Sequence, residues 1–179
     1  MKLKNILNHI DGKGLYSMFV AGAGKVLQHQ GELNRINVFP VPDGDTGSNL
    51  ASTVRAVLDR IKKSREYQYS MNEIADAAID GARGNSGVIF AQFLHGLREE
   101  TSRLKNVNLH DFAVGVRGSV QYVYRSISNP VEGTMITVIK DWADFLYLHR
   151  NSKRRFIGCE LNISRTDIGT LFNRDALKV

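Results

Sequence analysis

Apolar side chains recur at helical spacing in every long segment between residues 14 and 146. This periodicity predicts helices over about residues 14–30, 47–63 and 70–81, a fourth after the glycines at 81–87, and two more that begin after Asn108 and near Glu132. Ser70 and Glu73 have the spacing of a capping box, and Asn129-Pro130 separates the last two helices. No strand is predicted before residue 144, so we expect an all-α bundle.

Two glycines, Gly22 and Gly24, lie within the first predicted helix, where each costs roughly 1 kcal/mol relative to alanine. We expect that they let another helix pack closely. The sequence around them is not a phosphate-binding P-loop, because Phe19 stands where that motif needs glycine and Val26 follows Lys25 in place of serine or threonine.

Residues 37–50 read N-V-F-P-V-P-D-G-D-T-G-S-N-L and lead into the second predicted helix. Only Gly44 separates Asp43 from Asp45, so a tight loop can point both carboxylates at one Mg²⁺ ion, which usually takes one or two carboxylates together with phosphate oxygens and water. The residues that follow are typical of a helix start: Thr46, Ser48 and Asn49. Because a helix start presents free N–H groups and a positive dipole, the segment indicates a magnesium and phosphate site.

Two simpler interpretations of this segment compete with a magnesium site. An isolated Asp-x-Asp pair is more often a solvated acidic turn, and the residues alone leave that alternative open. A calcium-binding EF-hand fits badly. With Asp43 as its first residue, the glycine falls one position early and Val54 stands where a bidentate glutamate is needed.

A second candidate phosphate site is G-A-R-G-N-S-G at residues 81–87. Its glycines let backbone N–H groups approach phosphates at the start of the next helix, and Asn85 and Ser86 could donate further hydrogen bonds. A plain interhelical turn fits these glycines equally well, and Arg83 could neutralise phosphate or simply lie on the surface. The spacing does not match the G-x-G-x-x-G of a dinucleotide-binding fold.

Three stretches together resemble the nucleotide-binding (DhaL-type) domain of the dihydroxyacetone kinase family, in the variant that forms the N-terminal ATP-binding domain of bacterial fatty acid kinase. They are I-N-V-F-P-V-P-D-G-D-T-G-S-N at 36–49, G-A-R-G-N-S-G-V-I at 81–89 and P-V-E-G-T-M-I-T-V at 130–138. The resemblance covers roughly residues 10–142. It implies an antiparallel barrel of eight helices, of which about six are recognisable here, with nucleotide bound at the end where the loops that carry these motifs meet.

The resemblance also implies residue roles. Asp43 and Asp45 would hold Mg²⁺ between the β- and γ-phosphates of ATP, with Asn37 as a further ligand or as support for the ligands. The residues expected to contact the nucleotide phosphates are Thr46, Gly47, Ser48, Asn49, Gly84, Asn85, Ser86 and Gly87, and those expected to line the adenine pocket are Gly133, Thr134 and Met135. Met135 is also at a spacing typical of core packing. Catalysis would consist of positioning and charge neutralisation, and no residue is assigned a direct catalytic role.

The implied function is the ATP·Mg²⁺-binding domain of a phosphotransferase that phosphorylates a fatty acid presented by a separate lipid-binding protein. One alternative is the ADP-binding subunit of a dihydroxyacetone kinase, although that subunit carries G-D-G-D-H-G, with histidine where this chain has Thr46. Another is a degenerate, non-catalytic helical protein that serves in interactions. The partners implied are a nucleotide and either the lipid-binding protein or the remaining kinase domains.

From residue 144 the chain leaves the family's pattern, so we predict a nucleotide-binding helical domain over residues 1–143 and a divergent tail over 144–179. The tail lacks the V-V-D-x-G-G motif that closes the nucleotide pocket in similar proteins, which leaves the activity of this chain on its own an open point. Residues 155–163 could form a strand, and a short helix is predicted from Ser164. Two missing helices would leave apolar faces uncovered, which could pair two copies as a homodimer.

Composition and charge indicate the class of protein, its location and its partners. The 179 residues, 42% hydrophobic and 23% charged, are typical of one globular domain. No apolar run approaches the roughly 18–20 residues of a membrane span, the N-terminus lacks the apolar core of a signal peptide, and Cys159 is the single cysteine, so we expect a cytoplasmic protein. The net charge of +6 suits a polyanion such as ATP, and without a recognisable motif for it we do not expect nucleic acid as a partner.

Overall fold

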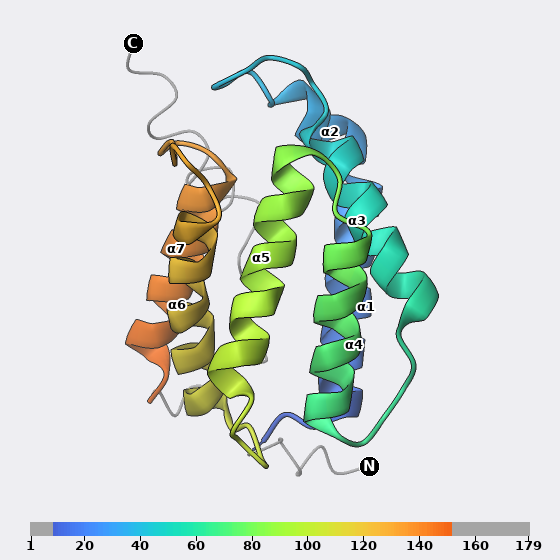
Figure 1. Ribbon diagram of the computed structural model, residues 1–179, viewed down its shortest axis with the longest axis vertical. Helices are drawn as coiled ribbons and strands as arrows, with labels where there is room; N and C mark the ends of the chain where they lie inside the picture. The colour runs from blue at the N-terminus through green and yellow to red at the C-terminus, as the bar shows by residue number, and fades with distance from the viewer. Residues whose placement is uncertain (1–8, 152–179) are drawn as a thin grey trace, which may run out of the picture.

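The computed structural model describes residues 9–151, and this part of the chain is all-α, which confirms the predicted fold class (Figure 1). Its seven helices, counted within these residues, are α1 (Gly12–Gln28), α2 (Gln30–Arg35), α3 (Thr46–Arg60), α4 (Tyr67–Asp80), α5 (Gly84–Thr101), α6 (Leu109–Arg125) and α7 (Met135–His149). Between residues 9 and 151, bridge pairing occurs at one place, where Ile10 lies antiparallel to Val107. None of the seven helices is both long and apolar enough to cross a membrane.

The central helix is α5. It packs against α3, α4, α6 and α7, while α1 covers α3 and α4, and the short α2 lies against α3 (Figure 1). Ile89, Phe93 and Leu97 of α5 are buried in a core to which the neighbouring helices contribute. A Cβ atom at Gly96 would meet the Ser119 backbone at 2.9 Å, so the glycine lets α6 approach α5 closely. α5 therefore joins the two sides of the molecule.

Short polar side chains fix several helix starts. At α6 the Asn108 side chain accepts a hydrogen bond from the Asp111 N–H at 2.8 Å, and the Asp111 carboxylate accepts one from the Asn108 N–H at 3.3 Å. At α1 the Asp11 carboxylate accepts from the Gly14 N–H at 2.8 Å. These caps satisfy N–H groups that have no partner within the helix itself.

Three sequence predictions about individual helices are wrong. The third predicted helix begins at Tyr67 and not at Ser70; Ser70 is buried inside α4, and its hydroxyl donates to the Gly12 carbonyl at 3.3 Å. The first predicted helix ends at Gln28, and a separate helix, α2, follows. Gly22 and Gly24 do not serve close packing, because a Cβ atom at either would meet no atom within 4 Å among the described residues.

The last described helix begins at Met135, three residues after the predicted start near Glu132, since Gly133 adopts a φ of +78° that ends any continuous helix there. α7 continues through the predicted boundary at residue 144 to His149. The strand predicted for residues 155–163 and the helix predicted from Ser164 lie outside the described residues.

Candidate functional site

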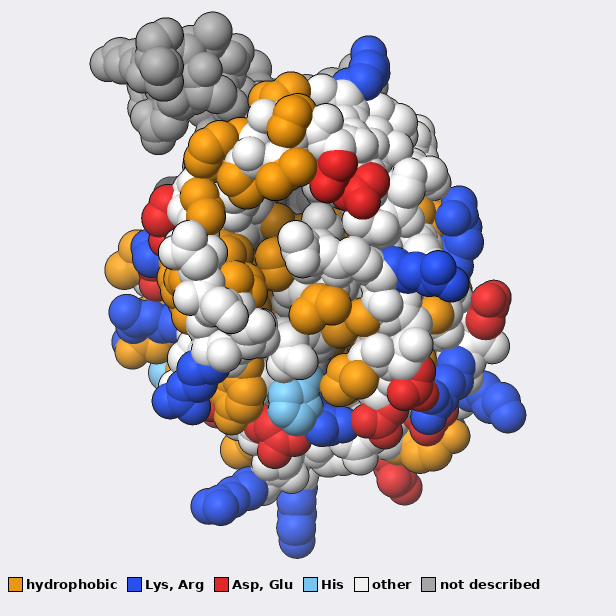
Figure 2. Space-filling model, turned by 45° about the horizontal axis from the view of Figure 1, so that its top comes forward, with side chains coloured by type: hydrophobic (Ala, Val, Ile, Leu, Met, Phe, Trp, Pro, Cys, Tyr) orange, Lys and Arg blue, Asp and Glu red, His pale blue; other side chains and the backbone are white. Residues whose placement is uncertain are grey.

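The starts of α3, α5 and α7 lie at one end of the molecule, which we call the loop end (Figure 1). Three loops lie at this end, formed by residues 36–45, 81–83 and 126–134. In Figure 2, which brings this end forward, acidic side chains lie beside a ridge of hydrophobic ones, with a hollow next to them. The first loop exposes Val38, Phe39 and Val41, so it contributes apolar surface as well as carboxylates.

Asn37 organises the acidic loop. Its side-chain oxygen accepts hydrogen bonds from the Asp45 N–H at 3.2 Å, the Thr46 N–H at 3.0 Å and the Thr46 hydroxyl at 2.6 Å. Its amide nitrogen donates to the Val41 carbonyl at 3.0 Å. With three donors already on its oxygen, Asn37 is better suited to support the metal ligands than to be one.

The acidic loop carries the two carboxylates, Asp43 and Asp45, on either side of Gly44. Asp43 is exposed and Asp45 half-buried, and Gly44 between them adopts a left-handed φ of +64°, a conformation that glycine takes without strain. No group of three or more histidine, cysteine, aspartate or glutamate side chains within residues 9–151 could enclose a metal ion. Two carboxylates suit Mg²⁺, which completes its shell with phosphate oxygens and water, and do not suit a closed zinc site.

The start of α3 is held by α2. The Ser48 N–H donates to the Asn34 side-chain oxygen at 3.0 Å, and the Ser48 hydroxyl accepts from Asn34 at 2.9 Å and from Gln30 at 3.3 Å. Gly47 is required here, because a Cβ atom would overlap the Gln30 carbonyl. Two first-turn N–H groups of α3, those of Thr46 and Ser48, are therefore already engaged.

The start of α5 is more open. Arg83 precedes it without a side-chain cap, and Arg83, Gly84 and Asn85 are exposed. Gly84 has a φ of +56°, and a Cβ atom there would overlap the Asn49 amide, so Asn49 packs against the turn. Gly87 is buried, with Thr53 Oγ1 2.5 Å from where its Cβ would lie. The exposed first turn is thus the stronger candidate for an anion.

One hydrogen bond joins these two helix starts. The Ser86 hydroxyl donates to the Thr46 hydroxyl at 3.2 Å, and the Thr46 hydroxyl donates in turn to Asn37. The sequence places Ser86 and Thr46 forty residues apart, and the structure brings them into contact. The glycine turn at 84–87 therefore lies next to the acidic loop.

The third loop carries the residues predicted to line an adenine pocket. Gly133 is exposed, and Thr134 caps α7 by accepting from the Ile136 N–H at 3.4 Å. Met135 is half-buried and packs against the core, so packing accounts for at least part of its role. Sequence reasoning gave no role to Glu132, Tyr124 and Thr137, whose side chains form a cluster beside this loop, although Glu132 and Thr137 lie within the motif at 130–138.

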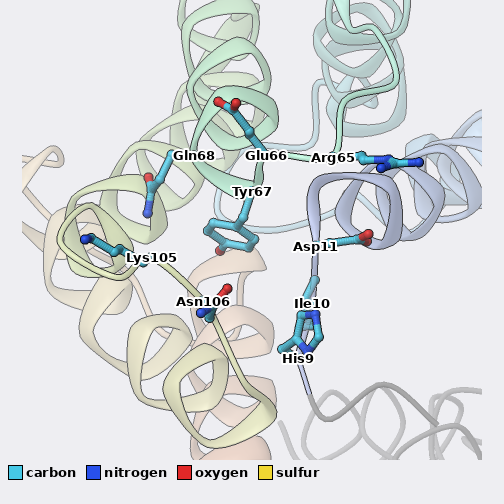
Figure 3. A pocket seen from close by; sticks show the side chains of 9 residues that line it. All are labelled: His9, Ile10, Asp11, Arg65, Glu66, Tyr67, Gln68, Lys105 and Asn106. Atoms are coloured by element: carbon cyan, nitrogen blue, oxygen red, sulfur yellow. The ribbon is translucent and has the colours of Figure 1, made fainter. Parts of the chain in front are cut away.

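A separate pocket of about 480 Å³ lies at the end where α1 and α4 begin (Figure 3). It is lined by His9, Ile10, Asp11, Arg65, Glu66, Tyr67, Gln68, Lys105 and Asn106, none of which is a predicted site residue. Two of its polar side chains are occupied in holding the backbone: Asp11 caps α1, and Gln68 donates to the Thr101 and Leu104 carbonyls at 2.5 and 3.0 Å. We assign this pocket no function.

Comparison with known proteins gives a family match that includes Asp43, Asp45 and the start of α5. Residues 40–158 match the family model described as the DAK2 domain. An uncharacterised protein of Staphylococcus saprophyticus is 34% identical over 141 residues, which are 78% of this chain and 26% of that protein. Protein YloV of Bacillus subtilis is 34% identical over 136 residues, 75% of this chain and 25% of that protein. The chain spans about a quarter of the length of these curated relatives.

Proposed function

The chain belongs to the DAK2 domain family, and on that premise we propose that its loop end binds ATP with Mg²⁺ and presents the terminal phosphate for transfer. The observation that carries this proposal is the hydrogen-bond chain from Ser86 through Thr46 to Asn37, with lengths of 3.2 and 2.6 Å. It ties the exposed first turn of α5 to the loop that bears Asp43 and Asp45. This contact supports a single site in which the two carboxylates hold the metal and the start of α5 holds an anion.

Each part of the loop end has a distinct role in this proposal. Asp43 and Asp45 hold Mg²⁺, which neutralises phosphate charge when it is bound. Residues 84–86 bind phosphate oxygens through backbone N–H groups and the Asn85 side chain, whereas the N–H of the buried Gly87 already donates to the Arg83 carbonyl at 3.0 Å. Asn37 and Ser48 keep the start of α3 in place through their hydrogen bonds, and the Ser86 hydroxyl joins the start of α5 to it. The chain's contribution to catalysis is positioning and electrostatic stabilisation, without a covalent intermediate.

The acceptor in our proposal is a fatty acid presented by a separate lipid-binding protein, as the three sequence motifs imply. Val38, Phe39 and Val41 are exposed next to the carboxylates, which supports an apolar partner at the loop end. Because the chain spans about a quarter of its relatives, the rest of such a protein could also supply groups for this step.

Calorimetric titration with ATP, with and without Mg²⁺, tests the proposal. We expect binding that depends on the metal and that Asp43→Ala or Asp45→Ala abolishes. Asp59→Ala is the matched control, because Asp59 is an exposed carboxylate on α3 away from its start, and its removal should leave binding unchanged.

The other outcomes point to the alternatives. Retained binding in both loop variants would remove the carboxylates from the mechanism. ADP that stays bound through purification would favour the ADP-holding subunit of a dihydroxyacetone kinase. A chain that binds neither nucleotide would favour the non-catalytic interaction protein.

A further inference from the structure

A cluster of three polar side chains joins α6 to α7 beside the third loop. The two carboxylate oxygens of Glu132 accept hydrogen bonds from the Tyr124 hydroxyl and from the Thr137 hydroxyl, each at 2.6 Å. The Thr137 hydroxyl also accepts the Gly133 N–H at 2.8 Å. The cluster therefore links the last turn of α6, the loop and the first turn of α7.

Glu132 is not part of the hydrophobic core, and packing does not explain it. The residue is exposed, as are the loop residues Ser128, Asn129, Pro130 and Gly133. The loop has few apolar anchors, so its conformation depends on polar contacts. Both hydroxyls donate to the charged carboxylate, which makes these hydrogen bonds stronger than neutral ones. The same contacts lower the pKa of Glu132, with the hydrogen bond from Thr137 contributing most, because both hydrogen bonds favour the ionised carboxylate.

We infer that Glu132 is a positioning residue of the proposed nucleotide site: its carboxylate holds the loop of residues 126–134 so that Gly133 and Thr134 can contact the base. This inference rests on the proposed function, and it concerns the base and not the phosphates. The phosphate-binding parts of the site, at the starts of α3 and α5, make their hydrogen bonds without Glu132.

The test compares ATP with inorganic tripolyphosphate, which lacks the base, both with Mg²⁺ and both by calorimetry on the full chain. We expect Glu132→Ala to weaken ATP binding roughly tenfold or more, because two charge-assisted hydrogen bonds that order the loop are lost. Tripolyphosphate binding should remain at the wild-type value. Glu132→Gln, which keeps one acceptor, should fall between wild type and Glu132→Ala.

Two further variants separate positioning from other effects. Asp59→Ala removes an equal charge from an exposed position on α3, outside the Glu132 cluster, and should leave ATP affinity unchanged. Tyr124→Phe removes a single hydroxyl and should weaken ATP binding less than Glu132→Ala does. Amide exchange of residues 131–137 should be faster in Glu132→Ala than in wild type, and this measurement needs no nucleotide.

Three results would count against the inference in distinguishable ways. Wild-type ATP affinity in Glu132→Ala would overturn it and leave the proposed function standing. An equal loss of ATP and tripolyphosphate binding would also overturn it, because the effect would then not be specific to the base. A wild-type chain that binds no ATP would overturn the proposed function itself.

Discussion

At the scale of single residues, Asn37 shows how one amide shapes a loop of charged groups. It stands before the two prolines and the acidic pair, and its oxygen gathers three donors from Asp45 and Thr46. If Asn37 served only as a metal ligand, its side-chain oxygen would accept no hydrogen bond from the loop when metal is absent. The geometry instead makes Asn37 part of the fold of the loop.

The variant Asn37→Ala should therefore destabilise the protein even in metal-free buffer. It leaves the Asp45 and Thr46 N–H groups without their acceptor in a half-buried place, which costs about 1–3 kcal/mol. Chemical unfolding in the presence of a chelator measures this free energy. Asn85→Ala, at an exposed position, is the control. Wild-type stability of Asn37→Ala without metal, together with lost Mg²⁺ binding, would make Asn37 a ligand after all.

At the scale of secondary-structure elements, α1 contains a weakness that packing does not explain. Gly22 and Gly24 are exposed within a 17-residue helix, and within residues 9–151 no atom lies within 4 Å of a Cβ atom placed at either. Glycine in a helix interior loses more backbone entropy on folding than alanine. By contrast, a Cβ atom at Gly12 would lie 2.5 Å from the Glu66 carbonyl oxygen, so that glycine is needed.

Gly22→Ala and Gly24→Ala should each raise the free energy of unfolding by about 0.5–1 kcal/mol, as the midpoint of urea denaturation will measure. Gly12→Ala should lower it, because the backbone of Glu66 has to move. If Gly22→Ala proves destabilising, this face of α1 is in contact with a part of the protein beyond residues 9–151.

The sequence predicted the helices whose boundaries are set locally and missed those set by distant contacts. The Asn108 cap of α6 involves residues three apart, and its pattern was readable. Ser70 was predicted as a helix cap, but its hydroxyl donates to the Gly12 carbonyl, 58 residues away. Likewise, α2 is held against α3 by the contacts of Gln30 and Asn34 with Ser48.

At the candidate site, the spacing of residues within the motifs predicted the roles of Asp43, Asp45 and residues 84–87. The motif at 130–138 contains Glu132 and Thr137, but the contact of Glu132 with Tyr124 could not be predicted, because these two side chains meet only when α6 and α7 fold back on each other.

At the scale of the whole molecule, the two ends differ in character. The loop end is exposed and rich in polar groups, whereas the far end contains Tyr67, a buried tyrosine in the first turn of α4. The Tyr67 hydroxyl lies 3.9 Å from the sulfur of Met71. Desolvation by burial raises the pKa of Tyr67 from 10.0 to about 12. Because ionising a buried tyrosine is unfavourable, the free energy of unfolding depends on the protonation of Tyr67.

Folding stability should fall as the pH rises from 10 towards 12, and Tyr67→Phe should reduce that fall. Below pH 10 Tyr67 is protonated in both states, so its contribution there is constant. Between pH 10 and 12 the unfolded chain has lost a proton that the folded chain retains, and stability decreases by up to about 1.4 kcal/mol per pH unit. Denaturation at pH 9, 10 and 11 measures the slope, with Tyr69→Phe, at an exposed position on the same helix, as the control for a lost hydroxyl. Equal slopes in wild type and Tyr67→Phe would mean that the folded protein ionises Tyr67 as readily as the unfolded chain does, and that water reaches the far end of the core.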